Sequence, residues 1–295
     1  MLRVLCVCTG NTCRSPMAEA LLQREADRLG LPVSVSSAGL AAFPGDPASA
    51  HAVSVMAELD VDLSGHRARA VTPYLLAESD YVICMSESHR AALLPYLPAE
   101  KLVVPPGGVP DPFGGDEERY RATRDALQAF LCAWLAEAAA PVLAPLTEAD
   151  LPAAAALEKA CFSTPWSEES LRGELQNENA RVWTLSVCRE IVGYIGVHLV
   201  QDEAEVMNLA VLPAFRRRGF GRRLLQTALA FCRENGCVRL FLEVRESNEA
   251  ALALYRSLGF TVCGRRKHYY QQPPEDALLL RCALSGEKDD PLCES

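Results

Sequence analysis

The sequence predicts an α/β protein with two domains, and three observations support this. The chain has 295 residues, enough for two hydrophobic cores of ordinary size. Over residues 1–140, short apolar runs suited to strands alternate with helical segments, which predicts a doubly wound parallel sheet with helices on both faces. From residue 145 onward, helices come first and are followed by successive strands, which predicts a mixed α/β domain over residues 145–284.

The first domain is expected to open with a buried strand at residues 3–7 and a helix at 17–29. Ser15 and Pro16 have the residue types of that helix's cap and first position. Apolar patterning predicts further strands at 81–85 and 101–104 and helices at 48–59 and 117–137. Residues 138–145 mix alanine, proline and valine without either periodicity, so we expect a short linker there.

The second domain is expected to begin with two helices, at residues 148–161 and 167–176. Strands should follow at 182–187, 191–200 and 203–211, then a helix at 221–234, a strand at 238–244, a helix at 249–258 and closing strands. Residues 285–295 are expected to form a flexible tail.

Composition is typical of a cytoplasmic globular protein, with 49% hydrophobic and 23% charged residues. The sequence has no signal-peptide pattern and no run of about 18 apolar residues, so we expect no export and no membrane insertion. A net charge of −9 argues against a general nucleic-acid binder. The 12 cysteines are scattered and no Cys/His cluster has zinc spacing, so we expect mostly reduced thiols and no metal.

An anion site of phosphate size is predicted where the first strand ends, in the Cys8 loop (residues 8–15). The loop must turn sharply into a helix, so its backbone N–H groups and the positive helix end form an anion nest. Arg14 adds a planar, two-pronged clamp for phosphate oxygens. The positive helix end and the Arg14 charge also favour the thiolate form of Cys8. The residues expected to surround the anion are Thr9, Gly10, Asn11, Thr12, Cys13 and Ser15.

A thiolate that attacks phosphorus needs a proton donor for the leaving group. Asp111 is the best candidate, because it lies in the Pro/Gly-rich segment 109–115. A lone Cys at a strand end is usually an inert core thiol and a lone Asp-Pro is usually a turn. The joint presence of Cys8, Arg14 and Asp111 instead predicts hydrolysis of a phosphate ester or a phosphoramidate.

Residues 8–16 together with Asp111 and Pro112 resemble the low-molecular-weight protein tyrosine phosphatase family, over about the first half of the chain. The resemblance implies a phosphocysteine intermediate on Cys8, transition-state binding by Arg14, and Asp111 as acid and then base. It also implies that Ser15 supports the leaving thiolate and that Asn11 holds the loop's shape. Residues 36–39 and 64–69 resemble the family as well, without an assigned role.

Thr12 bears on the substrate, because tyrosine-directed members usually carry an aliphatic residue there. Thr9 and Thr12, with the Asp-Pro-Phe sequence at 111–113, resemble the bacterial protein arginine phosphatases. Phosphoarginine is therefore favoured over phosphotyrosine, in a phosphorylated protein substrate. A thioredoxin-coupled arsenate reductase shares this loop, but Cys84 has no neighbouring cysteine to relay a disulfide. Cys13 either pairs reversibly with Cys8 or is a buried loop residue.

A second anion nest is predicted where a strand ending at residue 211 leads into the helix at 221–234. Gly219 and Gly221 let a phosphate approach the backbone closely. A solvated basic patch or a nucleic-acid contact is the alternative for Arg216, Arg217 and Arg218. The glycine spacing and the helix start favour binding of a pyrophosphate.

The pattern Arg216-x-x-Gly219-x-Gly221 resembles the acetyl-CoA loop of the GNAT superfamily of N-acetyltransferases. Residues 242–260, with Phe162 and residues 165–167, are similar to the ribosomal-protein-alanine N-acetyltransferases, and the match spans almost all of 145–284. The resemblance implies Glu243 as general base and Tyr255 as the acid that protonates the CoA thiolate. It implies cofactor binding by Leu209, Val211, Arg216, Arg217, Arg218, Gly219, Phe220, Gly221 and Asn248.

The expected acceptor is the N-terminus of a ribosomal protein, with lysine as the alternative. A protein α-amine titrates near ~7.7–8.0 against ~10.4 for lysine, so its neutral form is more abundant near neutral pH. Trp166, Tyr269 and Tyr270 either line the peptide groove or only pack. Glu243 as an exposed strand residue and Tyr255 as helix core are the alternatives to their catalytic roles. We expect a fusion of two active enzymes; the alternative is that one half only binds peptides.

Overall fold

The computed structural model describes residues 1–284, which divide into two compact units. The first unit is Met1–Ala140 with Val187–Glu190, and the second is Pro141–Ser186 with residues 191–284. The domain limits expected from the sequence, 1–140 and 145–284, stay predictions. The expected tail at 285–295 lies outside the described residues.

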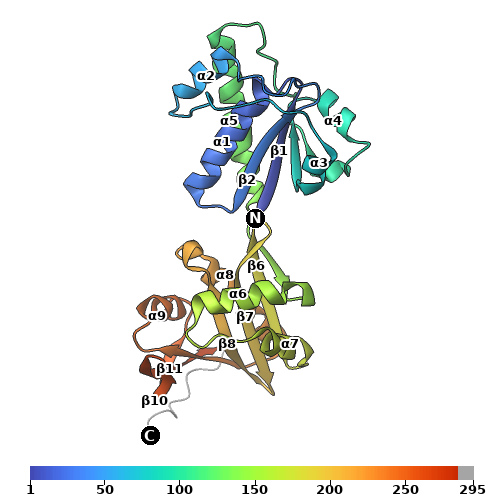
Figure 1. Ribbon diagram of the computed structural model, residues 1–295. Helices are drawn as coiled ribbons and strands as arrows, with labels where there is room; N and C mark the ends of the chain where they lie inside the picture. The colour runs from blue at the N-terminus through green and yellow to red at the C-terminus, as the bar shows by residue number, and fades with distance from the viewer. Residues whose placement is uncertain (285–295) are drawn as a thin grey trace. The chain divides into compact units, whose positions relative to one another are not determined.

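The first unit is built on a parallel sheet with strand order β2-β1-β3-β4. Helices α1 and α5 cover one face of the sheet and α3 and α4 cover the other (Figure 1), which confirms the doubly wound prediction. The elements are β1 (Leu2–Cys8), α1 (Arg14–Leu29), β2 (Val33–Gly39), α2 (Ala50–Ala57), α3 (Pro73–Glu78), β3 (Tyr81–Cys84), α4 (Glu87–Leu93), β4 (Leu102–Val103) and α5 (Glu117–Ala138).

Strand β1 is central, and its continuous apolar run reflects burial on both faces. Leu5 and Val7 pack with Leu76 of α3 and Leu93 of α4. From β1 the chain passes to β2 on one side and then crosses over to β3 on the other side of β1, so the carboxyl end of β1 at Cys8 lies where the strand order reverses. Such a point is where ligands bind in open α/β sheets.

Helix α1 begins earlier than expected, and the prediction that Ser15 caps it is wrong. The helix starts at Arg14 with Cys13 at the N-cap, and no side chain caps it. Ser15 lies inside the first turn, where its hydroxyl contacts Cys8 and Asn11 instead of a backbone N–H. Strand β2 was not predicted, because its serines mask the apolar pattern, and neither were the short helices α3 and α4.

The second unit contains a mixed sheet, as predicted (Figure 1). Its strand order is β10-β11-β9-β8-β7-β6-β5. Strands β8 and β9 pair in parallel, while the pairs on either side are antiparallel. The elements are β5 (Val142–Pro145), α6 (Leu151–Cys161), α7 (Glu168–Gln176), β6 (Ala180–Val187), β7 (Glu190–Val200), β8 (Glu203–Val211), α8 (Phe220–Glu234), β9 (Arg239–Arg245), α9 (Glu249–Arg256), β10 (Thr261–Gln271) and β11 (Pro274–Ala283).

The segment expected to be a linker contains a strand. Residues 142–145 form β5, which pairs antiparallel with β6 from Val142 opposite Ser186 to Pro145 opposite Trp183. A short edge strand with mostly exposed side chains has no apolar alternation, and this is why its sequence lacked the strand pattern.

A bulge in β8 opens the sheet between β8 and β9. Their parallel register runs only as far as Val206 opposite Leu242. On the other side of β8, Val206 and Asn208 face consecutive residues of β7, so Met207 is an extra residue in β8. Bulges bend a strand and end pairing. From Leu209 to Val211, β8 pairs with β7 and not with β9.

The state of the cysteines and the character of the helices can be described for residues 1–284. The cysteines in this range are free thiols. None of the helices in this range has the length and apolar character needed to cross a lipid bilayer.

Candidate active sites

Cys8 is the last residue of β1, and its sulfur faces the loop that follows. Sγ accepts a hydrogen bond from Asn11 N at 3.2 Å and lies 3.0 Å from Ser15 Oγ. The first N–H groups of α1 have no partner within the helix, and they carry the positive end of its dipole. These donors suit an anionic group, such as a phosphoryl group, next to the Cys8 sulfur.

Asn11 fixes the shape of the Cys8 loop. Its backbone is left-handed with φ of 55°, a conformation that asparagine tolerates, and its side chain is fully buried. Nδ2 donates to Ser15 Oγ at 2.9 Å and to Ser37 Oγ at 2.8 Å. Oδ1 accepts from Arg69 N at 2.8 Å, and the Asn11 carbonyl accepts from His66 Nε2 at 2.7 Å. Residues 36–39 and 64–69, which had no assigned role, therefore brace this loop.

Arg14 and Asp111 come together beside the Cys8 loop. Arg14 is 6% exposed, and its Nη2 forms an ion pair with a carboxylate oxygen of Asp111. Nη1 donates to the Val109 carbonyl at 3.3 Å, which ties the guanidinium to the loop that carries Asp111. Arg14 Nε is buried and has no hydrogen-bond partner among residues 1–284. The Asp111 side chain is half exposed, so its other face is open to a ligand.

His89 is a site residue that the sequence analysis missed. Its Nε2 lies 3.0 Å from Thr9 Oγ1 and its Nδ1 lies 2.6 Å from Ser86 Oγ. Burial lowers the pKa of His89 and the Arg14 charge lowers it further, while Asp111 opposes them. No local pattern could link His89 to Thr9, because 80 positions separate them.

The Cys13 sulfur contacts hydroxyl groups of residues outside the Cys8 loop. Its Sγ is 3.2 Å from the hydroxyl of Tyr120 and donates to Ser49 Oγ at 3.4 Å. Thr12 Oγ1 lies 3.6 Å from the same sulfur. Burial, together with the hydrogen bond to Cys13, raises the pKa of Tyr120 to about 12. Cys8 and Cys13 are both free thiols, and their reversible pairing stays a prediction.

The second unit has a cavity of about 700 Å³ beside the open stretch of β8. Its lining includes Cys161 and Phe162 from the end of α6, which the sequence analysis had not placed there. The predicted residues that line it are Leu209, Val211, Arg216, Arg217, Gly219, Phe220, Gly221, Asn248 and Tyr255. The structure therefore brings most of the second predicted constellation together.

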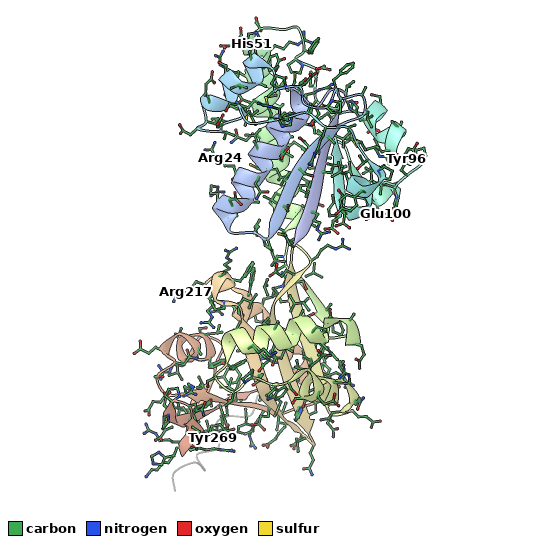
Figure 2. The ribbon with its side chains drawn as sticks, in the orientation of Figure 1. Arg24, His51, Tyr96, Glu100, Arg217 and Tyr269 are labelled. Carbon is green, nitrogen blue, oxygen red and sulfur yellow. The ribbon has the colours of Figure 1, made fainter. Side chains whose placement is uncertain are left out.

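The loop before α8 presents the helix N-terminus to this cavity. Gly219 is the N-cap with φ of 83°, and Arg217 (labelled in Figure 2) also has a left-handed backbone, with φ of 64°. A Cβ on Gly221 would lie 3.2 Å from Leu254 Cδ2 of α9, so glycine allows α8 and α9 to approach closely. An uncapped helix start reached through glycine is a site for an anionic group.

Three of the predicted cofactor residues already have partners within the protein. Arg216 Nε donates to the Val211 carbonyl at 3.1 Å. Arg218 does not line the cavity among the described residues; its guanidinium lies 4.9 Å from the centre of the Phe215 ring. Asn248 Oδ1 accepts a backbone N–H in the first turn of α9 and so caps that helix.

Glu243 lies on β9 beside the hairpin of β10 and β11, and it does not line the cavity among the described residues. Arg266 Nη1 lies 2.9 Å from Oε1 in an ion pair without hydrogen-bond geometry, and Oε1 is buried with no hydrogen-bond partner in residues 1–284. A hydrogen bond to Glu243 raises the pKa of Tyr269 (labelled in Figure 2) to about 12. Burial raises the pKa of Tyr270, and the Glu243 charge adds to this.

Tyr255 is 7% exposed and lies in the cavity wall. Burial raises the pKa of its hydroxyl, and the nearby Tyr270 adds to the effect. Tyr255 therefore stays protonated at neutral pH and can donate a proton. Glu158, a buried carboxylate of α6, was also missed, because a single glutamate in an alanine-rich helix forms no motif.

Known proteins resemble the two units separately. Residues 3–142 match the family described as low molecular weight phosphotyrosine protein phosphatase, and residues 151–260 match the acetyltransferase (GNAT) family. The [ribosomal protein bS18]-alanine N-acetyltransferase of Salmonella typhimurium is 40% identical over 142 residues, which are 48% of this chain and 95% of the relative. The protein-arginine-phosphatase of Bacillus subtilis is 39% identical over 137 residues, which are 43% of this chain and 91% of the relative.

Among solved structures, the ribosomal-protein-S18-alanine N-acetyltransferase of Escherichia coli has 34% sequence identity and a TM-score of 0.47. The match covers 51% of this chain and 97% of that one. The two family matches and the two curated relatives agree with the resemblances found in the motifs. The chain therefore belongs to two families, the low molecular weight phosphotyrosine protein phosphatases through its first half and the GNAT acetyltransferases through its second.

Proposed function

We propose that this protein is a bifunctional enzyme: a cysteine-dependent protein phosphatase that prefers phosphoarginine, and an acetyl-CoA-dependent acetyltransferase for the N-terminal alanine of a ribosomal protein. The phosphatase assignment rests mainly on the Cys8 sulfur. It accepts a backbone N–H and contacts a serine hydroxyl at the start of a helix, in the same loop as a buried Arg14 whose guanidinium meets Asp111.

In the proposed phosphatase reaction, the Cys8 thiolate attacks phosphorus and the bond from phosphorus to the leaving group breaks. Asp111 gives its proton to that leaving group, and Arg14 with the N–H groups of the loop binds the phosphoryl oxygens. Asp111 then takes a proton from a water molecule that cleaves the S–P bond. Ser15 supports the departing thiolate through its contact with Cys8 at 3.0 Å.

Two observations support the preference for phosphoarginine. Thr9 and Thr12 lie in the Cys8 loop, and the similar protein of Bacillus subtilis is a protein-arginine-phosphatase. Thr9 is exposed and Thr12 is half-buried, so both can approach a substrate. A hydroxyl suits a polar guanidinium better than it suits an aryl ring. Phosphotyrosine is the alternative substrate.

The phosphatase test compares phosphoarginine and phosphotyrosine peptides with the full chain. Cys8→Ser should abolish turnover, while Cys132→Ser, a control thiol in α5, should retain it. Thr12→Ile should shift the kcat/KM ratio toward phosphotyrosine by about tenfold, a change of roughly 1.4 kcal/mol. Equal turnover by wild type and Cys8→Ser would remove the phosphatase assignment and leave a unit that only binds phosphorylated peptides. A ratio unaffected by Thr12→Ile would remove the substrate argument.

The residues of the second cavity fit acetyl-CoA. The uncapped start of α8 suits a pyrophosphate, and the stretch of β8 that turns away from β9 at the bulge suits an extended pantetheine arm. Gly219, Gly221, Arg216 and Arg217 would hold the phosphates, and Leu209 and Val211 the arm. Acetyl-CoA, when bound, supplies the thioester that carries the acetyl group.

Glu243 is the proposed base, and the buried Oε1 with an unused hydrogen-bonding position supports this role. That oxygen can take a proton from the acceptor ammonium, directly or through water. Arg266 Nη1 lies 2.9 Å from the same oxygen in an ion pair, so it neighbours the proposed base. Tyr255, protonated in the cavity wall, is the proposed donor to the leaving sulfur.

The acetyltransferase test uses a basic peptide that begins with alanine. Glu243→Gln should lower kcat/KM by about a hundredfold, the usual contribution of a general base. Glu246→Gln is the matched control, because Glu246 only pairs with Arg265 at the surface. Transfer that persists in Glu243→Gln would show that the base is another group. A peptide with a blocked α-amine and a free lysine tests the alternative acceptor.

A further inference from the structure

Glu158 is fully buried in α6, yet neither proposed reaction uses it. Its carboxylate accepts three hydrogen bonds. Oε1 accepts from the hydroxyl of Tyr194 and, at 3.0 Å, from Asn208 Nδ2. Oε2 accepts from Trp166 N at 2.7 Å. Burial raises the pKa of Glu158, while these hydrogen bonds oppose the rise.

The three donors come from three separate parts of the second unit. Tyr194 belongs to β7, and Asn208 belongs to β8, directly after the extra residue Met207. Asn208 also precedes Leu209, which lines the cavity. Trp166 belongs to the segment between α6 and α7, here named the acceptor loop (residues 162–167). Glu158 therefore ties the acceptor loop to the bent part of β8.

The acceptor loop extends from the cavity toward the proposed base. Phe162, at its start, lines the cavity. Ser163 Oγ donates to the Gln272 carbonyl at 2.7 Å, between β10 and β11. The same hairpin carries Tyr269, whose hydroxyl meets Glu243. The acceptor loop therefore borders the cavity through Phe162 and contacts, through Ser163, the hairpin that neighbours Glu243.

We propose that Glu158 is a positioning residue that fixes the place of the acceptor loop relative to β8 and so sets the affinity for the acceptor peptide. The inference rests on the proposed acetyltransferase function. A carboxylate is needed at this position because the Trp166 backbone and the Asn208 amide both donate. The amide NH2 group of a glutamine would face either the Trp166 N–H or the Asn208 NH2 group. That buried donor would then lose its acceptor.

The test measures steady-state acetylation of the alanine-initiated peptide by the full chain, with acetyl-CoA saturating. Glu158→Gln should raise KM for the peptide by about tenfold, the effect of losing one charged hydrogen bond, while kcat changes less than about threefold. The Kd for acetyl-CoA, measured by calorimetry, should stay at the wild-type value. Ser163→Ala removes the loop's other tether at the surface and should raise KM for the peptide by about threefold.

Glu174→Gln is the control, because this partly buried glutamate pairs with His198 elsewhere in the same unit. It should leave both the peptide KM and the acetyl-CoA Kd unchanged. A parallel weakening of peptide and acetyl-CoA binding in Glu158→Gln would overturn the proposal and indicate a role in folding alone. An unchanged peptide KM in both Glu158→Gln and Ser163→Ala would overturn it as well. A wild-type protein that transfers no acetyl group would instead contradict the proposed function itself.

Discussion

Replacing Asn11 with alanine should destabilise the phosphatase unit and stop its catalysis. The substitution removes a fully buried side chain that donates to Ser15 and Ser37 and accepts from the backbone of Arg69. It also places an alanine at φ of 55°. Both effects distort the loop in which Asn11 N donates to the Cys8 sulfur.

The expected loss of unfolding free energy is about 4 kcal/mol. Each of the three hydrogen bonds contributes about 1 kcal/mol, and a left-handed backbone at alanine adds about 1 kcal/mol. Ser37→Ala removes one of these hydrogen bonds and leaves the backbone of Asn11 in place. It should cost about 1 kcal/mol, so the two variants form a graded pair.

Calorimetric unfolding of the full chain measures these losses, with the transition of the acetyltransferase unit as internal reference. Asn11→Ala should lower the midpoint of the phosphatase unit by roughly 10 °C. Acetylation of the alanine-initiated peptide should continue at the wild-type rate. The reasoning is refuted if Asn11→Ala costs no more than Ser37→Ala, or if both transitions fall equally.

Three further changes test other parts of the structure. A Cβ on Gly39 would lie 2.5 Å from the Thr9 carbonyl oxygen, so Gly39→Ala should displace the Cys8 loop and lower phosphatase kcat/KM by about a hundredfold, with acetylation as the unaffected control. Burial, with the Arg14 charge, lowers the pKa of His89, so as pH falls below about 6.5 the unfolded state binds the proton first and stability declines. Unfolding midpoints measured from about pH 7.5 to about pH 5 should decline less in His89→Gln, and an equal slope would contradict this account. Gly219→Ala strains a backbone at φ of 83°, so the acetyl-CoA Kd from calorimetry should rise about fivefold while phosphatase turnover stays unchanged.

The sequence was sufficient to predict the two loops that lead from a strand into an uncapped helix start, because short-range chemistry builds each of them. A strand that ends at Cys8 and a helix that starts at Arg14 leave few conformations for the residues between them, and the loop at Gly219 before α8 is similar. The family resemblances were confirmed, since they rest on motifs of this local kind. Parallel and mixed sheets also followed from the order of the elements, which the connections largely fix.

The sequence was misleading at Ser15 and at residues 142–145, where a contact with a distant part of the chain decided the local structure. Ser15 has the residue type of a helix cap, but its hydroxyl contacts Cys8 and Asn11, and the N-cap of α1 is Cys13, two residues earlier. The pattern of residues 142–145 indicated a linker, but backbone pairing with β6 makes them a strand. In both cases a tertiary partner outweighed the local preference.

Only the tertiary structure decided which distant groups support the two sites. Arg69 meets Asn11 across 58 positions, His89 meets Thr9 across 80, and Glu158 meets Asn208 across 50. The types of these residues have no functional meaning by themselves, because a buried carboxylate or imidazole depends on the donors, acceptors and charges that folding places around it. Motifs specify groups that the backbone itself holds together, whereas the supporting contacts exist only after the sheets and helices have packed.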